Sequence, residues 1–215
     1  MFALGLEPSD FGGDLILIGD ADNNAVEVRA ISDDIVITGL MGANIWYEVD
    51  DGTGDPSYVR TDSLTLAGRN TNLQNLRGHM GQGNDLFRAE GLNILDRTAV
   101  FGGPGHDDIG FYQTTIADDL FMNTSGGDDL ISLDEVIVGD NLAVFTLDGN
   151  DTIAIGGRLD GDADNTIIRG RTLISTGDGL DRIGIRNSLL GEAALLLTGN
   201  DEDFVGLDGL TAEAS

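Results

Sequence analysis

Two stretches of the chain, Leu120–Leu133 (LFMNTSGGDDLISL) and Leu142–Ile155 (LAVFTLDGNDTIAI), share one pattern. Each begins with a short apolar strand, passes through a corner of Gly, Asp and Asn, and ends with a second apolar strand. Glycine, aspartate and asparagine are the residues that tight turns favour, each for its own conformational reason. The two stretches start 22 residues apart, which indicates a structural repeat.

The same pattern recurs along most of the 215 residues. In most copies a polar anchor follows the first strand residue at a distance of nine; the anchors are Asn24, Asp85, Asp108, Asp129, Asp151, Asp181 and Asp203. Short strands at a fixed period, without helical spacing, are typical of solenoids. The sequence therefore predicts an all-β fold. It is a β-solenoid (β-helix) with coils of about 22 residues and Gly/Asp-rich corners. The alternative is a β-sandwich, which also has short strands but does not require a corner sequence at fixed spacing.

The repeat predicts one domain over residues 1–215, with roughly eight to ten coils at the usual strand spacing. Two segments break the rhythm. Residues 45–75 predict an irregular coil with a protruding loop at 50–58, and residues 156–171 predict an additional short coil or strand. Insertions in solenoids often carry function on one face, but insertion drift on a tolerant surface is the favoured explanation here.

The charge of the chain limits its partners. It contains 30 Asp, 8 Glu and 11 Arg, and its formal net charge is -27. Such a charge repels phosphates, which excludes nucleic acid, and favours cations or a cationic partner. There is no Cys, no run long enough to span a membrane, and no secretory signal in residues 1–12.

One corner carries a motif for a metal. Gly102–Gly110 (GGPGHDDIG) fits the pattern G-G-x-G-x-D-x-apolar-x, and the segments 81–87, 148–153 and 177–183 fit it in part. On these residues the chain resembles the repeats-in-toxin (hemolysin-type) calcium-binding repeats. More broadly, through Leu173–Ile183, it resembles the acidic β-solenoid repeats of large bacterial surface proteins. The first resemblance implies that glycine-rich turns supply carbonyls to Ca²⁺ and that Asp85, Asp107, Asp151 and Asp181 supply carboxylates.

The pentapeptide GDADN occurs twice, at residues 19–23 and 161–165. Turn formation is sufficient to explain both copies, and their alternating carboxylates could also bind a hard cation. Stacked corners would bring Asp residues into rows that repel one another unless Asn, solvent or a bound cation intervenes. The predicted calcium ligands are Asp20, Asp22, Asp85, Asp107, Asp108, Asp129, Asp151, Asp162, Asp164, Asp181 and Asp203.

Catalytic motifs are absent from the sequence. There is no G-x-S-x-G, no phosphate loop and no H-E-x-x-H, and His79 and His106 are the only histidines. The sequence therefore predicts no catalytic residues and a structural or adhesive module, extracellular or at the cell surface. We expect it to associate with itself by coil stacking, as a filament, or to belong to a longer chain; cell-surface polysaccharide is a further expected partner. The alternative is a polysaccharide lyase or hydrolase, with a groove lined by residues 45–60 or 156–171.

Overall fold

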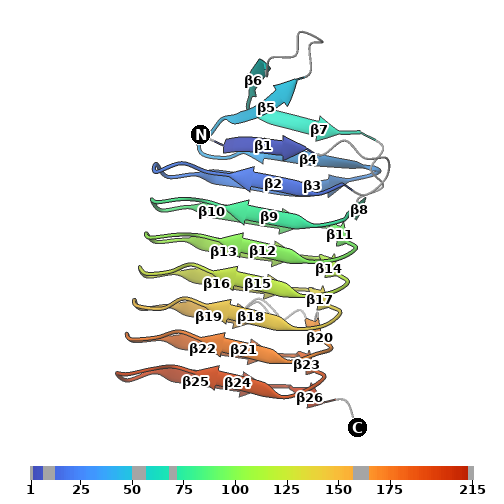
Figure 1. Ribbon diagram of the computed structural model, residues 1–215. Coiled ribbons are helices and arrows are strands. Elements are labelled where there is room, and N and C mark those ends of the chain that lie inside the picture. The colour runs from blue at the N-terminus through green and yellow to red at the C-terminus, as the bar shows by residue number, and fades with distance from the viewer. Residues whose placement is uncertain (1, 7–12, 50–56, 68–71, 157–164, 213–215) are drawn as a thin grey trace.

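The computed structural model of the chain describes residues 2–6, 13–49, 57–67, 72–156 and 165–212 (Figure 1). These residues are all-β: their strands form three sheets, and none of them is helical. Across the described residues, no helix is long and apolar enough to pass through a membrane.

The ten-stranded sheet contains one strand from each repeat and three further strands from the N-terminal part of the chain. Its order is β24 (Ala194–Leu197), β21 (Thr172–Ser175), β18 (Leu142–Phe145), β15 (Leu120–Asn123), β12 (Thr98–Phe101), β9 (Leu76–His79), β2 (Leu15–Ile18), β1 (Phe2–Leu6), β5 (Ile45–Val49) and β6 (Ser57–Thr61).

The two other sheets are built in the same way. The nine-stranded sheet has the order β25 (Phe204–Asp208), β22 (Arg182–Arg186), β19 (Thr152–Ile155), β16 (Leu130–Asp134), β13 (Asp108–Tyr112), β10 (Leu86–Glu90), β3 (Ala25–Ile31), β4 (Asp34–Gly39) and β7 (Ser63–Leu66). The seven-stranded sheet has the order β26 (Thr211–Ala212), β23 (Leu189–Leu190), β20 (Ile167–Ile168), β17 (Ile137–Val138), β14 (Thr115–Ile116), β11 (Asn93–Ile94) and β8 (Asn72–Leu73).

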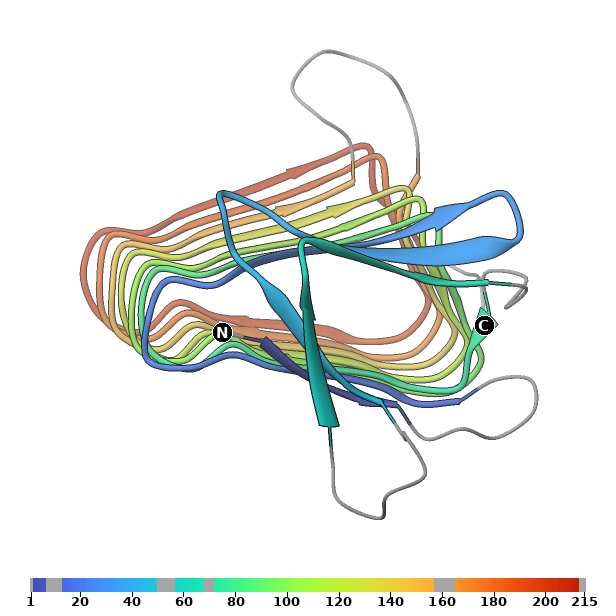
Figure 2. The same ribbon diagram turned by 90° about the horizontal axis from the view of Figure 1, so that it is seen from above.

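The predicted period is confirmed by the pairing of the strands. In the ten-stranded sheet Leu76 pairs with Thr98, Thr98 with Leu120 and Leu120 with Leu142, each 22 residues further along. Each repeat supplies one strand to each sheet, and successive repeats follow the same path when viewed along the stack (Figure 2). The parallel sheets are compatible with a β-helix. From β9 onward the described chain contains six such repeats, and β2 and β3 belong to a seventh, so eight to ten was too many.

Both predicted interruptions are insertions within a repeat. The step from Leu142 to Thr172 is 30 residues, which is eight more than 22, and pairing resumes at β20. Ile167 and Ile168 are not an additional strand, because β20 is the counterpart of β17. The rest of the coil or strand predicted at 156–171 falls largely on residues 157–164, which lie outside the described residues. The step from Leu15 to Leu76 is 61 residues, which is 39 more than 22. The described part of 45–75 forms β5, β6, β7 and β8, so residues 57 and 58 of the predicted loop lie in a strand.

The two ends of the stack differ (Figure 1). At the N-terminal end, β1 pairs antiparallel with β2, and β4 pairs antiparallel with β3. At the C-terminal end, β24, β25 and β26 are the last strands of their sheets and remain parallel to the repeat. Apolar side chains are exposed there, with Phe204 63% and Leu207 55% accessible.

Alternation along each strand fills the interior. In β15, Leu120 and Met122 are buried while Phe121 and Asn123 are half-buried on the outer side. Successive side chains of a strand point to opposite faces, so each repeat adds one layer of Leu, Ile, Val, Met or Phe to a continuous core. This core holds the corners in register, and the corners carry the predicted site.

Candidate functional site

Six of the predicted ligands form one buried column at the corner between the ten-stranded and nine-stranded sheets. This inner column begins at Asn24 and continues through Asp85, Asp107, Asp129, Asp151, Asp181 and Asp203. The first five aspartates are 1–3% exposed. Asp107, rather than Asp108, occupies the column. The column spacing is therefore 22 residues from Asp85 to Asp107 and from Asp107 to Asp129.

Every aspartate of the inner column binds the backbone of the preceding repeat. The main-chain amide of Asp85 donates to Oδ1 of Asp107 at 2.9 Å, and the amide of Asp107 donates to Oδ1 of Asp129 at 2.8 Å. The amides of Asp129, Asp151 and Asp181 are bound in the same way by the next carboxylate, at 2.9–3.0 Å. A buried amide without a partner is costly, so these carboxylates satisfy donors that the turn would otherwise leave unpaired.

The second carboxylate oxygen, Oδ2, is buried and has no close hydrogen-bond partner in Asp85, Asp107, Asp129, Asp151 and Asp181. In Asp129 and Asp151 a threonine hydroxyl, that of Thr124 and of Thr146, still lies near enough to lower the pKa of the carboxyl. In the first repeat the column holds Asn24, whose Nδ2 donates to the carbonyl oxygens of Asp22 at 2.6 Å and Met80 at 2.8 Å. An aspartate at the equivalent position has an oxygen, Oδ2, in place of the Nδ2 donor of Asn24. A proton on Oδ2, or a cation, would supply the missing positive partner.

Burial raises the pKa of these carboxyls. The pKa of Asp107 and of Asp129 rises to about 7, chiefly because burial disfavours the charged form. Neighbouring carboxylates of the column raise both values further. The pKa of Asp85 and of Asp151 is raised for the same main reason. Partial protonation is therefore one way in which the column relieves the repulsion expected of stacked aspartates.

A second column of side chains, the outer column, lies next to the inner one and includes Asn84, His106 and Asp128. These side chains accept hydrogen bonds from amides of the following repeat. The amide of His106 donates to Oδ1 of Asn84 at 2.9 Å, that of Asp128 to Nδ1 of His106 at 2.8 Å, and that of Asn150 to Oδ1 of Asp128 at 2.8 Å. Each side chain of this outer column thus holds the following repeat, whereas each inner aspartate holds the preceding one. His106, an expected turn residue, accepts through Nδ1 here.

The remaining predicted ligands lie apart from the inner column. Asp108 lies on β13, where Oδ2 is 3.9 Å from Nη2 of Arg88, and burial raises its pKa. Asp20 and Asp22 lie in the first corner, and Oδ1 of Asp20 accepts from the amide of Asp22 at 3.1 Å. Asp162 and Asp164 lie outside the described residues.

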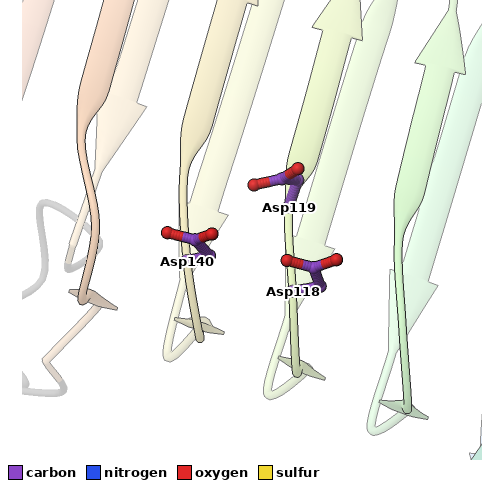
Figure 3. Close-up of side chains that lie close together, drawn as sticks. All are labelled: Asp118, Asp119 and Asp140. Atoms are coloured by element: carbon purple, nitrogen blue, oxygen red, sulfur yellow. The ribbon is translucent and has the colours of Figure 1, made fainter.

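A second acidic group lies at another corner, between the seven-stranded and ten-stranded sheets. Asp118, Asp119 and Asp140 each offer a carboxylate oxygen, and these oxygens lie within 4.8 Å of one another (Figure 3). Nε of Arg97 lies 3.0 Å from Oδ2 of Asp118 and 3.7 Å from Oδ2 of Asp119. Asn141 also donates to Oδ1 of Asp119, through its amide and through Nδ2. Arg97 therefore offsets part of the charge of this cluster, which remains open to a hard cation.

The doublet spacing in the sequence could have revealed this second cluster, since Asp118 and Asp140 are 22 residues apart. The outer column had a weaker signal, because Asn, His and Asp alternate there. Comparison with protein-family models, with curated proteins and with solved structures finds no match.

Proposed function

We propose that the chain is a non-catalytic structural or adhesive module of the β-solenoid type, extracellular or at the cell surface. One observation carries this proposal: the residues that would be metal ligands or acid-base groups instead bind the backbone of the neighbouring repeat. The same contact recurs from Asn24 to Asp203. A hydrogen bond that every repeat makes indicates a structural role, whereas an active site is one particular arrangement of residues at one place.

Calcium enters the proposal as an added stabiliser. The carboxylates of the half-buried Asp118 and Asp119 and of the exposed Asp140 supply hard oxygen ligands. Calcium sites of extracellular modules bind with dissociation constants of about 10⁻⁴–10⁻³ M. A cation at Oδ2 of the inner column would take the place of a proton beside turn carbonyls. This second location is what the resemblance to repeats-in-toxin sequences implies, and it is the alternative to a proton on Oδ2.

Self-association belongs to the proposal through the C-terminal end of the stack. The apolar side chains of β24 and β25 are exposed there, beside strand edges that can still pair. The N-terminal end presents antiparallel strands instead. The two ends of the stack therefore do not match each other in the way that two successive repeats do. This difference favours pairing of two C-terminal ends over a head-to-tail filament.

A polysaccharide lyase or hydrolase is the second candidate function. A groove of about 970 Å³ on the outer face of the nine-stranded sheet favours it, and acidic and basic side chains line that groove. Among the described residues of the segments expected to line such a groove, Gly156 contributes, and residues 45–49 and 57–60 do not.

Two measurements test the proposal together. Circular dichroism in chelator, followed by titration with Ca²⁺ and with Mg²⁺ as the control, should show a folded chain that Ca²⁺ stabilises against heat. A panel of acidic and neutral polysaccharides should remain uncleaved. Turnover of any member would replace the scaffold function with the enzyme.

A further inference from the structure

The groove on the nine-stranded sheet has a floor of small side chains. Ser132, Ala154 and Gly184 occupy the same outward position in three successive repeats. Larger residues line both sides of this floor. The groove therefore exists because the register of the sheet places three small residues side by side. The lining extends from Glu27 on β3 to Phe204 on β25, six strand spacings or roughly 29 Å along the stack.

Two arginines flank the floor on one strand. Arg182 and Arg186 lie on either side of Gly184 in β22 and are both exposed. Residues four apart in a strand face the same way, here about 13 Å apart along the backbone. Among the described residues neither arginine has an ion pair, whereas Arg29, Arg97 and Arg171 each lie within 4 Å of a carboxylate. These two guanidinium groups are therefore available to an anion, in a lining that also carries carboxylates.

The rest of the lining is mixed in charge and includes an aromatic ring. Glu27, Arg88 and Glu90 lie toward the N-terminal end of the groove, where Glu90 pairs with Arg29, whereas Asp134 and Glu135 lie beside the floor. Their carboxylates accept hydrogen bonds from hydroxyl groups. Tyr112 lies over Gly110: a Cβ at Gly110 would be 2.5 Å from Cε2 of the ring. Such a ring offers a flat apolar surface, and Phe204 offers another at the opposite end of the groove.

We propose that this groove binds a linear acidic polysaccharide, with Arg182 and Arg186 contacting its carboxylates and Tyr112 packing against a sugar ring. Sugars combine hydroxyls, apolar ring faces and, in uronic acids, carboxylates, which together match the lining. A peptide is less suited, because the strands that carry the floor and the two arginines, β16, β19 and β22, are paired on both sides and offer no free edge for strand addition. The inference deepens the adhesive part of the proposed function and rests on it.

The test is calorimetric titration of the full chain with polygalacturonate fragments in chelator, because calcium crosslinks this polymer. The wild type should bind them, and R182Q/R186Q should bind at least about tenfold more weakly, since each charge-assisted contact contributes substantially. The control R77Q/R169Q makes the same change in net charge outside the groove and should bind within about twofold of the wild type. Y112A should also weaken binding.

Several outcomes would overturn the inference. These are no binding by the wild type, equal weakening by both double variants, equal affinity for the fully methyl-esterified fragments, or equal affinity for a poly-aspartate peptide. Circular dichroism establishes that each variant is folded. Product analysis on the same samples separates the two proposals: cleavage would overturn the non-catalytic function and leave the binding site, whereas absence of binding would leave the scaffold.

Discussion

The carboxylate of Asp129 holds the main-chain amide of Asp107, which lies 22 residues earlier, at 2.8 Å. Because Asp107 binds the amide of Asp85 in the same way, a chain of side-chain contacts runs along the stack beside the backbone ladders. The aspartate at each corner is thus required by a backbone amide of the preceding repeat. An acidic repeat can arise from this requirement alone.

Stability should fall as pH rises from 5 to 8. The pKa of Asp107 and of Asp129 is about 7 in the folded chain and near 3.8 when unperturbed. The folded state therefore binds more protons than the unfolded state in this window, and its stabilisation is lost as the carboxyls ionise. Melting temperatures across this range should show the decline, and D107N/D129N should flatten it. H106N, which keeps an acceptor in the outer column, is the control; a melting temperature that rises with pH would refute the assignment.

Glycine should be indispensable at position 105 and replaceable at position 126. Gly105 has φ of 144°, and a Cβ there would lie 1.6 Å from the carbonyl oxygen of Gly83 in the preceding repeat. At Gly126 the nearest atom would be 3.4 Å away. G105A should lower the free energy of unfolding in urea by at least about 2 kcal/mol, and G126A by about 0.5 kcal/mol or less. Equal effects would show that the corners do not stack as described.

Deletion of residues 157–164 should preserve the fold. It removes eight residues and restores the 22-residue step between Thr152 and Arg182. Shortening a connection between two strands changes the loop-closure entropy only slightly, so the free energy of unfolding should change by about 1 kcal/mol or less. Urea unfolding monitored by circular dichroism checks this expectation, and loss of a cooperative transition would mean that the segment is part of the core.

The C-terminal end should limit association to pairs. Val205 and Leu207 lie on the last strand of the nine-stranded sheet and are 42% and 55% exposed. Sedimentation velocity should detect dimers that increase with salt, since the charge of each chain opposes contact. V205E/L207E should abolish them, and L180E, at an exposed corner, should not. Fibres, or monomers under all conditions, would contradict this prediction.

The sequence predicted the period because it is carried by individual residues. Anchors such as Asp129 and Asp151 must align in space, so their spacing of 22 is the length of one repeat. The N-terminal strands could not be predicted in the same way. Residues 34–66 have no anchor, and their antiparallel pairing depends on the edge that β3 presents.

The candidate site was predicted in part. Asp85 and Asp107 were identified, but no pattern distinguishes a carboxylate that binds an amide from one that binds a metal. The groove gave even less signal, because Ser132, Ala154 and Gly184 share only small size and register. Register becomes visible only when the strands are paired.

The most direct test of the inner column is the free energy of unfolding of D129N and D129A at pH 8, in chelator and in Ca²⁺. Asparagine keeps the acceptor for the amide of Asp107 and adds a donor, as Asn24 does in the first repeat. We predict that D129N is at least as stable as the wild type in both solutions and that D129A loses about 1–3 kcal/mol in both. If D129N instead loses as much as D129A in Ca²⁺, and all three proteins are equally stable in chelator, Asp129 is a calcium ligand and the account of the corner is wrong.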